Sequence, residues 1–216
     1  GAKRMARQIF RNFIAPCDLG LDFHTSTRGR SNVLHVRADM ADADVERVAR
    51  AYASNVVISS EGPSGSLRRE ASAAGVPTVT IEMGEAHRFQ RTLIDEALDG
   101  VRSVMAEFGM LPSEQVRWPG WRTVIQGDDE KTWIRADVGG LVEMHFPNGS
   151  YVSEGETICT ITNPFKTESS TVDAPFPGLL VGALENPLVY PGNPICHLDE
   201  ATRRAVEQSG GMVHRA

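Results

Sequence analysis

The sequence predicts an α/β layer with a mixed sheet, followed by a smaller all-β unit. Two observations support this prediction: strand and helix patterns alternate through the first half of the chain, and short apolar stretches broken by Gly and Pro take over from Lys131. Alternating strands and helices are typical of a sheet covered by helices, whereas many short strands indicate a sandwich. We expect an α/β part with its connector at 1–126, an all-β part at 127–200 and a tail at 201–216.

Each element of the α/β part has a local signal. Val45, Val48 and Tyr52 lie at helical spacing, and Asp42 precedes them as a helix N-cap. The run Thr-Val-Thr-Ile-Glu within 77–83 is rich in β-branched residues and is typical of a strand. The predicted elements are, in order, a helix at the start of the chain, strands at 19–23 and 33–36, a helix at 42–52, a strand at 55–59, a helix at 66–74, a strand at 77–83 and a helix at 89–108.

The all-β part contains a weak internal repeat. Ala136-Asp-Val-Gly-Gly-Leu-Val is echoed by Ala174-Pro-Phe-Pro-Gly-Leu-Leu-Val, and turns at Asn148-Gly149 and Pro191-Gly192 follow the two copies. Each copy is one half-unit that cannot bury its apolar face alone. Two interlocking half-units predict a small sandwich of the biotinyl/lipoyl type.

Composition excludes several classes of protein. The 216 residues carry a net charge of -6, so a basic surface for nucleic acid is not expected. A membrane span is not expected either, because there is no apolar run of about 18 residues. Three cysteines without a CxxC pair fit a reducing compartment, and the start of the chain has no apolar signal segment. These features predict a cytoplasmic protein.

His24 and Glu82 each come at the end of a predicted strand. Functional residues of α/β sheets gather at strand ends, so the two are expected to belong together. A histidine on a stiff strand end suits a metal ligand, with Asp22 to orient a neighbouring group, and a partly buried Glu82 suits a general base. The competing interpretations are a surface histidine bonded to its own loop and a glutamate paired with a nearby arginine.

Arginines form the next candidate group. Arg28 lies in the polar loop after His24, and Arg68 and Arg69 follow a Gly/Ser loop at the start of a short helix. A guanidinium group can hold a carboxylate through two hydrogen bonds, which suits substrate binding. Solvated surface charge is the alternative interpretation.

Two further patterns point to weaker hypotheses. Lys166 lies in the hairpin where a biotin- or lipoyl-bearing lysine would lie, but its neighbours Phe165 and Thr167 differ from the residues that flank such lysines. The His-x-x-Glu spacing of His197 and Glu200 spans the end of a strand rather than one helix face, and we interpret it as a coincidence.

Taken together, these segments resemble the succinylglutamate desuccinylase/aspartoacylase family of the zinc-carboxypeptidase superfamily. The resemblance rests on Asp22-Phe-His-Thr25, on Gly75-Val-Pro-Thr-Val-Thr-Ile-Glu-Met-Gly84 with the helix that follows, and on Ala174-Pro-Phe-Pro-Gly178 in the β-rich part. It covers nearly the whole chain. It implies part of a zinc-carboxypeptidase-like mixed sheet with helices, one zinc ion, and hydrolysis of the amide bond of a small N-acyl amino acid.

The resemblance also implies roles for individual residues. His24 corresponds to the third zinc ligand of the family, and Glu82 to the glutamate that activates the zinc-bound water. Arg68 or Arg69 would stabilise the polarised carbonyl or hold the substrate carboxylate, and Arg28 is a further candidate for substrate binding.

One departure from the family pattern matters. The family's first two zinc ligands lie on an upstream His-x-x-Glu segment, which does not occur before His24. Since zinc sites need about three protein ligands, we expect weak or no zinc binding by this chain alone. We also expect a bare sheet edge, and a homo-oligomer is compatible with the charge.

The alternative to a hydrolase is a non-catalytic carrier or interaction module that uses the lipoyl-like tail. A mass increment on Lys166 would favour that alternative. A nucleotide-binding protein and a serine hydrolase are not supported, because the sequence contains no GxGxxG, GxxxxGK[ST] or GxSxG motif.

Overall fold

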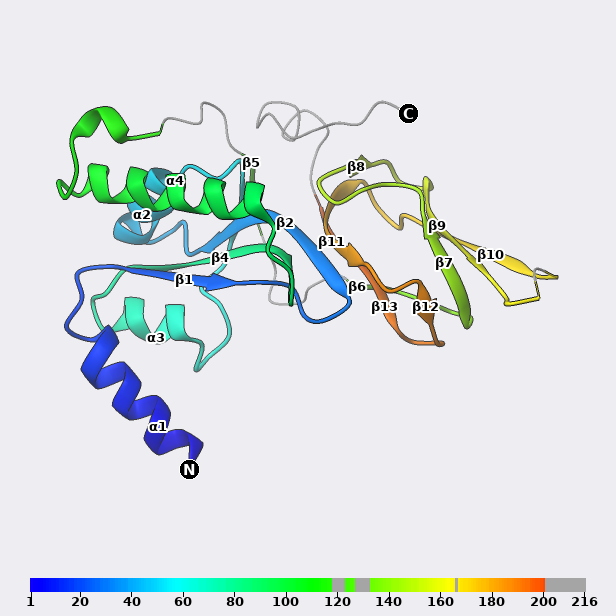
Figure 1. Cartoon of the computed structure of the whole chain (residues 1–216), viewed down its shortest axis with the longest axis horizontal. Coiled ribbons are helices and arrows are strands. Elements are labelled where there is room, and N and C mark those ends of the chain that lie inside the picture. The colour runs from blue at the N-terminus through cyan, green and yellow to red at the C-terminus, as the bar shows by residue number, and fades with distance from the viewer. Residues whose placement is uncertain (118–122, 127–132, 166, 201–216) are drawn as a thin grey trace.

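The computed structural model describes residues 1–117, 123–126, 133–165 and 167–200. Within them, a nine-stranded mixed sheet carries helices on its faces, and a four-stranded antiparallel sheet lies beside one end of it (Figure 1). The first helix projects away from the sheet and has no buried residue. In this part of the chain, no helix combines the length and apolarity that a membrane span requires.

The elements follow the alternation that the sequence predicts. The helices are α1 (Ala2–Ile9), continued by a π-helical turn at Phe10–Ile14, α2 (Ala43–Tyr52), α3 (Leu67–Ala73) and α4 (Arg91–Glu107), with a 3₁₀ turn at Ser113–Gln115. The larger sheet contains β1 (Gly20–His24), β2 (Arg30–Ala38), β3 (Val56–Ser59), β4 (Thr78–Glu85), β5 (Thr123–Gln126), β6 (Trp133–Arg135), β8 (Tyr151–Val152), β11 (Gly178–Leu184) and β13 (Pro194–Glu200). The smaller sheet contains β7 (Gly140–Met144), β9 (Thr157–Thr162), β10 (Ser169–Asp173) and β12 (Leu188–Val189).

Strand direction changes in the middle of the larger sheet. Its main path runs β1-β4-β2-β11-β13-β6, while β3 pairs with β2 and β5 pairs with β3. β1 and β4 are parallel, but β2 is antiparallel to β4, and β3 and β5 run with β2. The carboxyl ends of β1 and β4 therefore lie at one end of the sheet, and those of β2, β3 and β5 lie at the other.

Helices cover the two faces of the α/β part. α2 and α4 lie on one face, where they bury a core with β2, β3 and β4, and α3 contacts β1 and β4 (Figure 1). The largest fully buried side chain of that core is Tyr52, which packs against Gly100 of α4. The buried members of this core are Val36, Ala38, Val45, Val48, Ala49, Ala51, Tyr52, Val57, Val79, Ile81 and Val104.

The β-rich part continues the mixed sheet. β11 pairs with β13 on one side and, through Gly182–Leu184, with the start of β2 on the other. A second core, with Ile158, Leu180 and Leu198 among its buried residues, joins strands of the two sheets. Part of the β-rich segment, β6, β8, β11 and β13, therefore shares a sheet with the α/β part, because the edge of β2 accepts β11 as a partner.

The biotinyl/lipoyl-like character predicted for 127–200 is not confirmed. The domain boundaries predicted from the sequence stay predictions. Residues 127–132 at the start of the predicted β-rich part and the predicted tail at 201–216 lie outside the described residues.

The N-terminus of α2 gives a direct test of the local sequence signals. The Asp42 carboxylate accepts hydrogen bonds from the backbone N–H groups of Asp44, at 2.9 Å, and Val45, at 3.2 Å, which confirms the predicted N-cap. We expect Asp42→Ala to lower the free energy of unfolding by about 1 kcal/mol, because these N–H groups lose their acceptor. Urea denaturation measures the change, and Asp42→Asn, which keeps an acceptor oxygen, is the matched control. Equal stability of Asp42→Ala and the wild type would contradict the assignment.

Candidate active site

His24 and Glu82 lie side by side on neighbouring parallel strands. The register of β1 and β4 runs from Gly20 opposite Thr78 to His24 opposite Glu82. Residues paired in this way project from the same face of a sheet. Asp22, two residues before His24, shares that face, and its Oδ2 atom lies 3.0 Å from His24 Nε2. The structure thus places the imidazole and the two carboxylates together, while their chemical roles stay predictions.

The strand that carries Glu82 extends further than predicted. β4 continues to Glu85 and bends at Gly84, which has a φ of +56°. A side chain on Gly84 would collide with Gln90, whose Oε1 accepts a hydrogen bond from the Glu85 backbone N–H at 2.8 Å. β4 stays paired with β2 through Gly84 and Glu85, so Glu82 lies three residues before the end of the strand.

Both oxygens of the Glu82 carboxylate have partners on β2. Asn32 Nδ2 donates to Oε2 at 3.2 Å, and Arg37 Nε lies 3.8 Å from Oε1. The side chains of Arg37 and Glu82 are 10% and 17% exposed, so this ion pair is largely shielded from water. The competing interpretation from the sequence, a glutamate paired with a nearby arginine, therefore describes the surroundings of Glu82 correctly. Each carboxylate oxygen can accept more than one hydrogen bond, so this pairing is compatible with a role of Glu82 as a base.

A bulge in β2 brings Asn32 and Arg37 to the same carboxylate. Asn32 pairs with Gly84 and His35 pairs with Glu82, so three residue steps on β2 match two on β4. The extra residue puts Asn32 on the same face as His35 and Arg37. Sequence reasoning placed this strand only at 33–36 and missed both partners. The alternation of apolar residues with His35 and Arg37 was the sequence signal that indicates a longer strand with these polar side chains on one face.

Buried polar residues extend this group toward β13. The His35 ring is fully buried, and burial together with the charge of Arg37 lowers its pKa to about 3. On β13, His197 Nε2 lies 2.9 Å from Asp199 Oδ1. Burial acts to raise the pKa of Asp199, but the hydrogen bond from His197 and the charge of Arg37 bring it below its ordinary value. The partner of His197 is thus Asp199 rather than Glu200, which is exposed.

Arg68 and Arg69 do not join this group. The Arg68 guanidinium donates to the Ser60 hydroxyl at 2.8 Å, and Arg69 pairs with Glu61 at 2.9 Å. Both line a cavity of about 300 Å³ together with Thr78, at the start of β4. Thr78 lies four residues before Glu82, which is roughly 13 Å along a strand. The separation arises because β2 and β3 run against β4, so the loop after β3 lies at the opposite end of the sheet.

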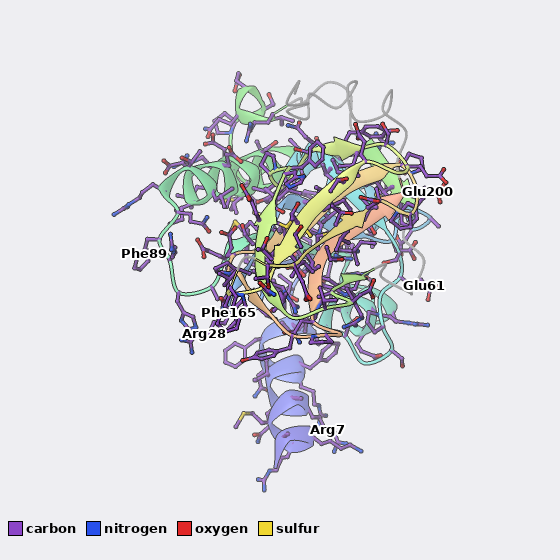
Figure 2. All side chains as sticks on the ribbon, turned by 90° about the vertical axis from the view of Figure 1, so that its right-hand side faces the viewer. Arg7, Arg28, Glu61, Phe89, Phe165 and Glu200 are labelled. Atoms are coloured by element: carbon purple, nitrogen blue, oxygen red, sulfur yellow. The ribbon has the colours of Figure 1, made fainter. Side chains whose placement is uncertain are left out.

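Arg28 lies at the same end as His24. It is exposed in the loop between β1 and β2, and Figure 2 shows it at the margin of the molecule. Backbone hydrogen bonds fix this loop to its neighbours: the Ser26 N–H donates to the Gly84 carbonyl at 3.2 Å, and the N–H groups of Glu185 and Asn186 donate to the Gly29 carbonyl at 2.8 and 3.2 Å. Of the three predicted arginines, Arg28 is the one placed at the rim of the His24 and Glu82 pair.

The described residues bring together no complete set of metal ligands. His24 supplies an imidazole, but across the described ranges no three or more His, Cys, Asp or Glu side chains are placed to hold a metal ion. Catalytic zinc sites use about three protein ligands and a water. Lys166, the residue that would carry a cofactor in the alternative function, lies outside the described residues.

Comparison with known proteins identifies the class to which this arrangement belongs. The family model of the succinylglutamate desuccinylase/aspartoacylase catalytic domain matches residues 1–108. The chain belongs to the succinylglutamate desuccinylase/aspartoacylase family. No curated protein matches it by sequence.

Solved structures show the same fold. The ectoine utilization protein EutE (DoeB) from Ruegeria pomeroyi, in its apo form, superposes with a TM-score of 0.78 at 19% identity, over 90% of this chain and 64% of that one. A succinylglutamate desuccinylase from Silicibacter sp. TM1040 gives 0.74 at 21% identity, over 89% and 62%. A succinylglutamate desuccinylase/aspartoacylase from Rhodobacter sphaeroides gives 0.74 at 15% identity, over 92% and 63%. The chain thus spans less than two thirds of the length of these structures.

The buried His35 ring predicts an acid-sensitive fold. Its pKa is lowered from an ordinary 6.5 to about 3, so the unfolded chain binds a proton below pH 6.5 that the folded chain does not bind. The stability that depends on neutral His35 is therefore complete above pH 6.5 and is lost as the pH falls toward 3, by at most about 1.4 kcal/mol per pH unit.

We expect His35→Gln to flatten this fall in the free energy of unfolding between pH 6.5 and 4. Urea denaturation at several pH values measures the slope. The nearby groups that also titrate or carry charge, Arg37, His197 and Asp199, are present in both proteins. His145→Gln, at an exposed position, should keep the wild-type slope. A slope unchanged by His35→Gln would show that this ring does not control the acid sensitivity.

Proposed function

We propose that this chain carries part of the active site of a zinc-dependent hydrolase that cleaves the amide bond of an N-acyl amino acid. Family membership supports the reaction class, and the observation that supports the site is the register that pairs His24 with Glu82. Metal-assisted amide hydrolysis needs a metal ligand and a base close enough to act on one water molecule. The pairing of the two strand ends supports such an arrangement.

In this proposal His24 is one zinc ligand. Its Nε2 atom lies 3.0 Å from the Asp22 carboxylate, so Nδ1 is the nitrogen available to a metal, and Asp22 fixes the orientation of the ring. The other ligands, a His-x-x-Glu pair, would come from polypeptide outside these 216 residues. Zinc, when bound, would polarise the substrate carbonyl and the attacking water.

Glu82 is the general base of the proposed reaction. Its carboxylate would take a proton from the attacking water and deliver it to the amine that leaves. Asn32 and Arg37 each hold one carboxylate oxygen, at 3.2 and 3.8 Å, and restrict its rotation. A base with a fixed orientation avoids the loss of rate that a rotating carboxylate would cause.

Arg28 is the proposed contact for the substrate carboxylate. It lies at the rim of the site and is exposed, so its long side chain can reach a small anion bound there. The structure places Arg68 and Arg69 at the other end of the sheet, so a direct role in binding the same substrate molecule is not part of this proposal. The chemical class of substrate is a small N-acyl amino acid.

Replacement of the base tests the reaction. In a form of the protein that hydrolyses N-acyl amino acids, Glu82→Gln should lower kcat by at least about 100-fold, because the amide cannot accept the proton. The bound zinc, measured by elemental analysis, should stay the same. Glu85→Gln, three residues further along β4, is the matched control and should keep most of the activity. Retained turnover in Glu82→Gln would remove this residue from the mechanism.

Zinc binding tests the metal ligand. The 216-residue chain alone is expected to hold far less than one equivalent of zinc after dialysis, and a form joined to a segment with the His-x-x-Glu ligands should hold one. His24→Ala should then weaken the binding by about 10-fold or more, whereas His145→Ala should not. Equimolar zinc on the isolated chain, kept by His24→Ala, would refute the assignment of His24.

A further inference from the structure

We propose that Gly182 of the β-rich part helps to position the base: Asn32 and Arg37 fix the Glu82 carboxylate, and Gly182 holds Asn32 in place. We call Asn32, Arg37 and Gly182 the positioning network. Asn32 and Arg37 belong to β2, whereas Gly182 belongs to β11. The inference rests on the proposed role of Glu82 and extends it to a part of the chain outside the matched catalytic domain.

Gly182 makes room for Asn32. It pairs with Asn32 on β2 and with His197 on β13, so it lies between two polar side chains on the same face of the sheet. A Cβ atom at this position would collide with Asn32 Oδ1 and would lie 3.1 Å from the Ser31 carbonyl oxygen. The absence of a side chain therefore lets the Asn32 amide lie over β11 and reach Glu82.

Arg37 completes the surroundings of the carboxylate. Its Nε atom lies 3.8 Å from Glu82 Oε1, and only 10% of its side chain is exposed. Burial lowers the pKa of the Arg37 guanidinium, while the charges of Glu82 and Asp199 act to raise it.

Stacked side chains connect the start of β2 with β6 and β13. His197, which pairs with Asp199, stacks on Trp133 of β6 with ring centroids 5.2 Å apart, and the Arg30 guanidinium lies 4.9 Å from the Trp133 ring centroid. Arg30 begins β2, the strand that carries Asn32. The stack and the pairing with β11 therefore both hold this end of β2.

Gly182→Ala tests whether Gly182 acts through Asn32. In a crystal structure of this variant, the Asn32 amide should be displaced and its 3.2 Å contact with Glu82 lost. Gly139→Ala is the matched control, because a Cβ there meets its nearest atom only at 3.4 Å. Asn32→Ala, which adds no volume, removes the same contact and decides the point if Gly182→Ala does not fold. An unmoved Glu82 carboxylate in Asn32→Ala, or an unmoved Asn32 in Gly182→Ala, would overturn the proposal.

Kinetics separate positioning from general stability. In a zinc-loaded form of the protein that hydrolyses N-acyl amino acids, Gly182→Ala and Asn32→Ala should each lower kcat by about 10- to 100-fold with little change in KM, as loss of groups that orient an active residue does. The double variant should lose no more than the worse single variant, because both changes remove one interaction. Losses that multiply would refute the coupling.

Arg37 is tested in the same way. Arg37→Met should lower kcat with little change in KM, and Arg37→Lys should recover part of the activity because it keeps the charge. An Arg37→Met variant with wild-type kcat would exclude its contribution. A zinc-loaded form of the protein without amide hydrolysis would sink the proposed function, but the crystallographic comparison would still decide whether the network positions Glu82.

Discussion

The hydrogen-bonded register between β1 and β4 determines which side chains lie together at the candidate active site. Parallel pairing fixes the distance between paired residues, and it puts His24 and Glu82 on one face with Asp22. A shift by one residue would turn Glu82 to the face that α2 and α4 cover. The buried neighbours Val79 and Ile81 prevent such a shift, because it would expose them on the polar face.

Much of the local structure follows from the sequence. The helix that begins after Asp42 and the strand around Thr78–Glu85 form where hydrophobic periodicity and capping predict them. His24 and Glu82 could be singled out because each follows a short apolar run. Local signals of this kind depend on nearest neighbours along the chain, which is why they transfer directly from sequence to structure.

Long-range pairing accounts for what the sequence could not predict. Arg68 and Arg69 were candidates for contacts with the substrate, but the reversed direction of β2 and β3 places them at the far end of the sheet from His24. Asn32 gave no local signal, since its contact with Glu82 arises only when β2 pairs with β4. Strand order and direction are set by the packing of the whole sheet, and a single sequence does not encode them in any short segment.

The bulge in β2 has a consequence for how relatives of this protein vary. One extra residue between Asn32 and His35 puts both of these side chains on the same face as Glu82. Deletion of that residue would turn the side chains of β2 that precede it to the opposite face of the sheet. Arg30 would then leave Trp133 as well. The length of this strand is therefore under a tighter constraint than its composition: substitutions at Val33 and Leu34 can be absorbed by repacking, whereas a change of a single residue in length cannot.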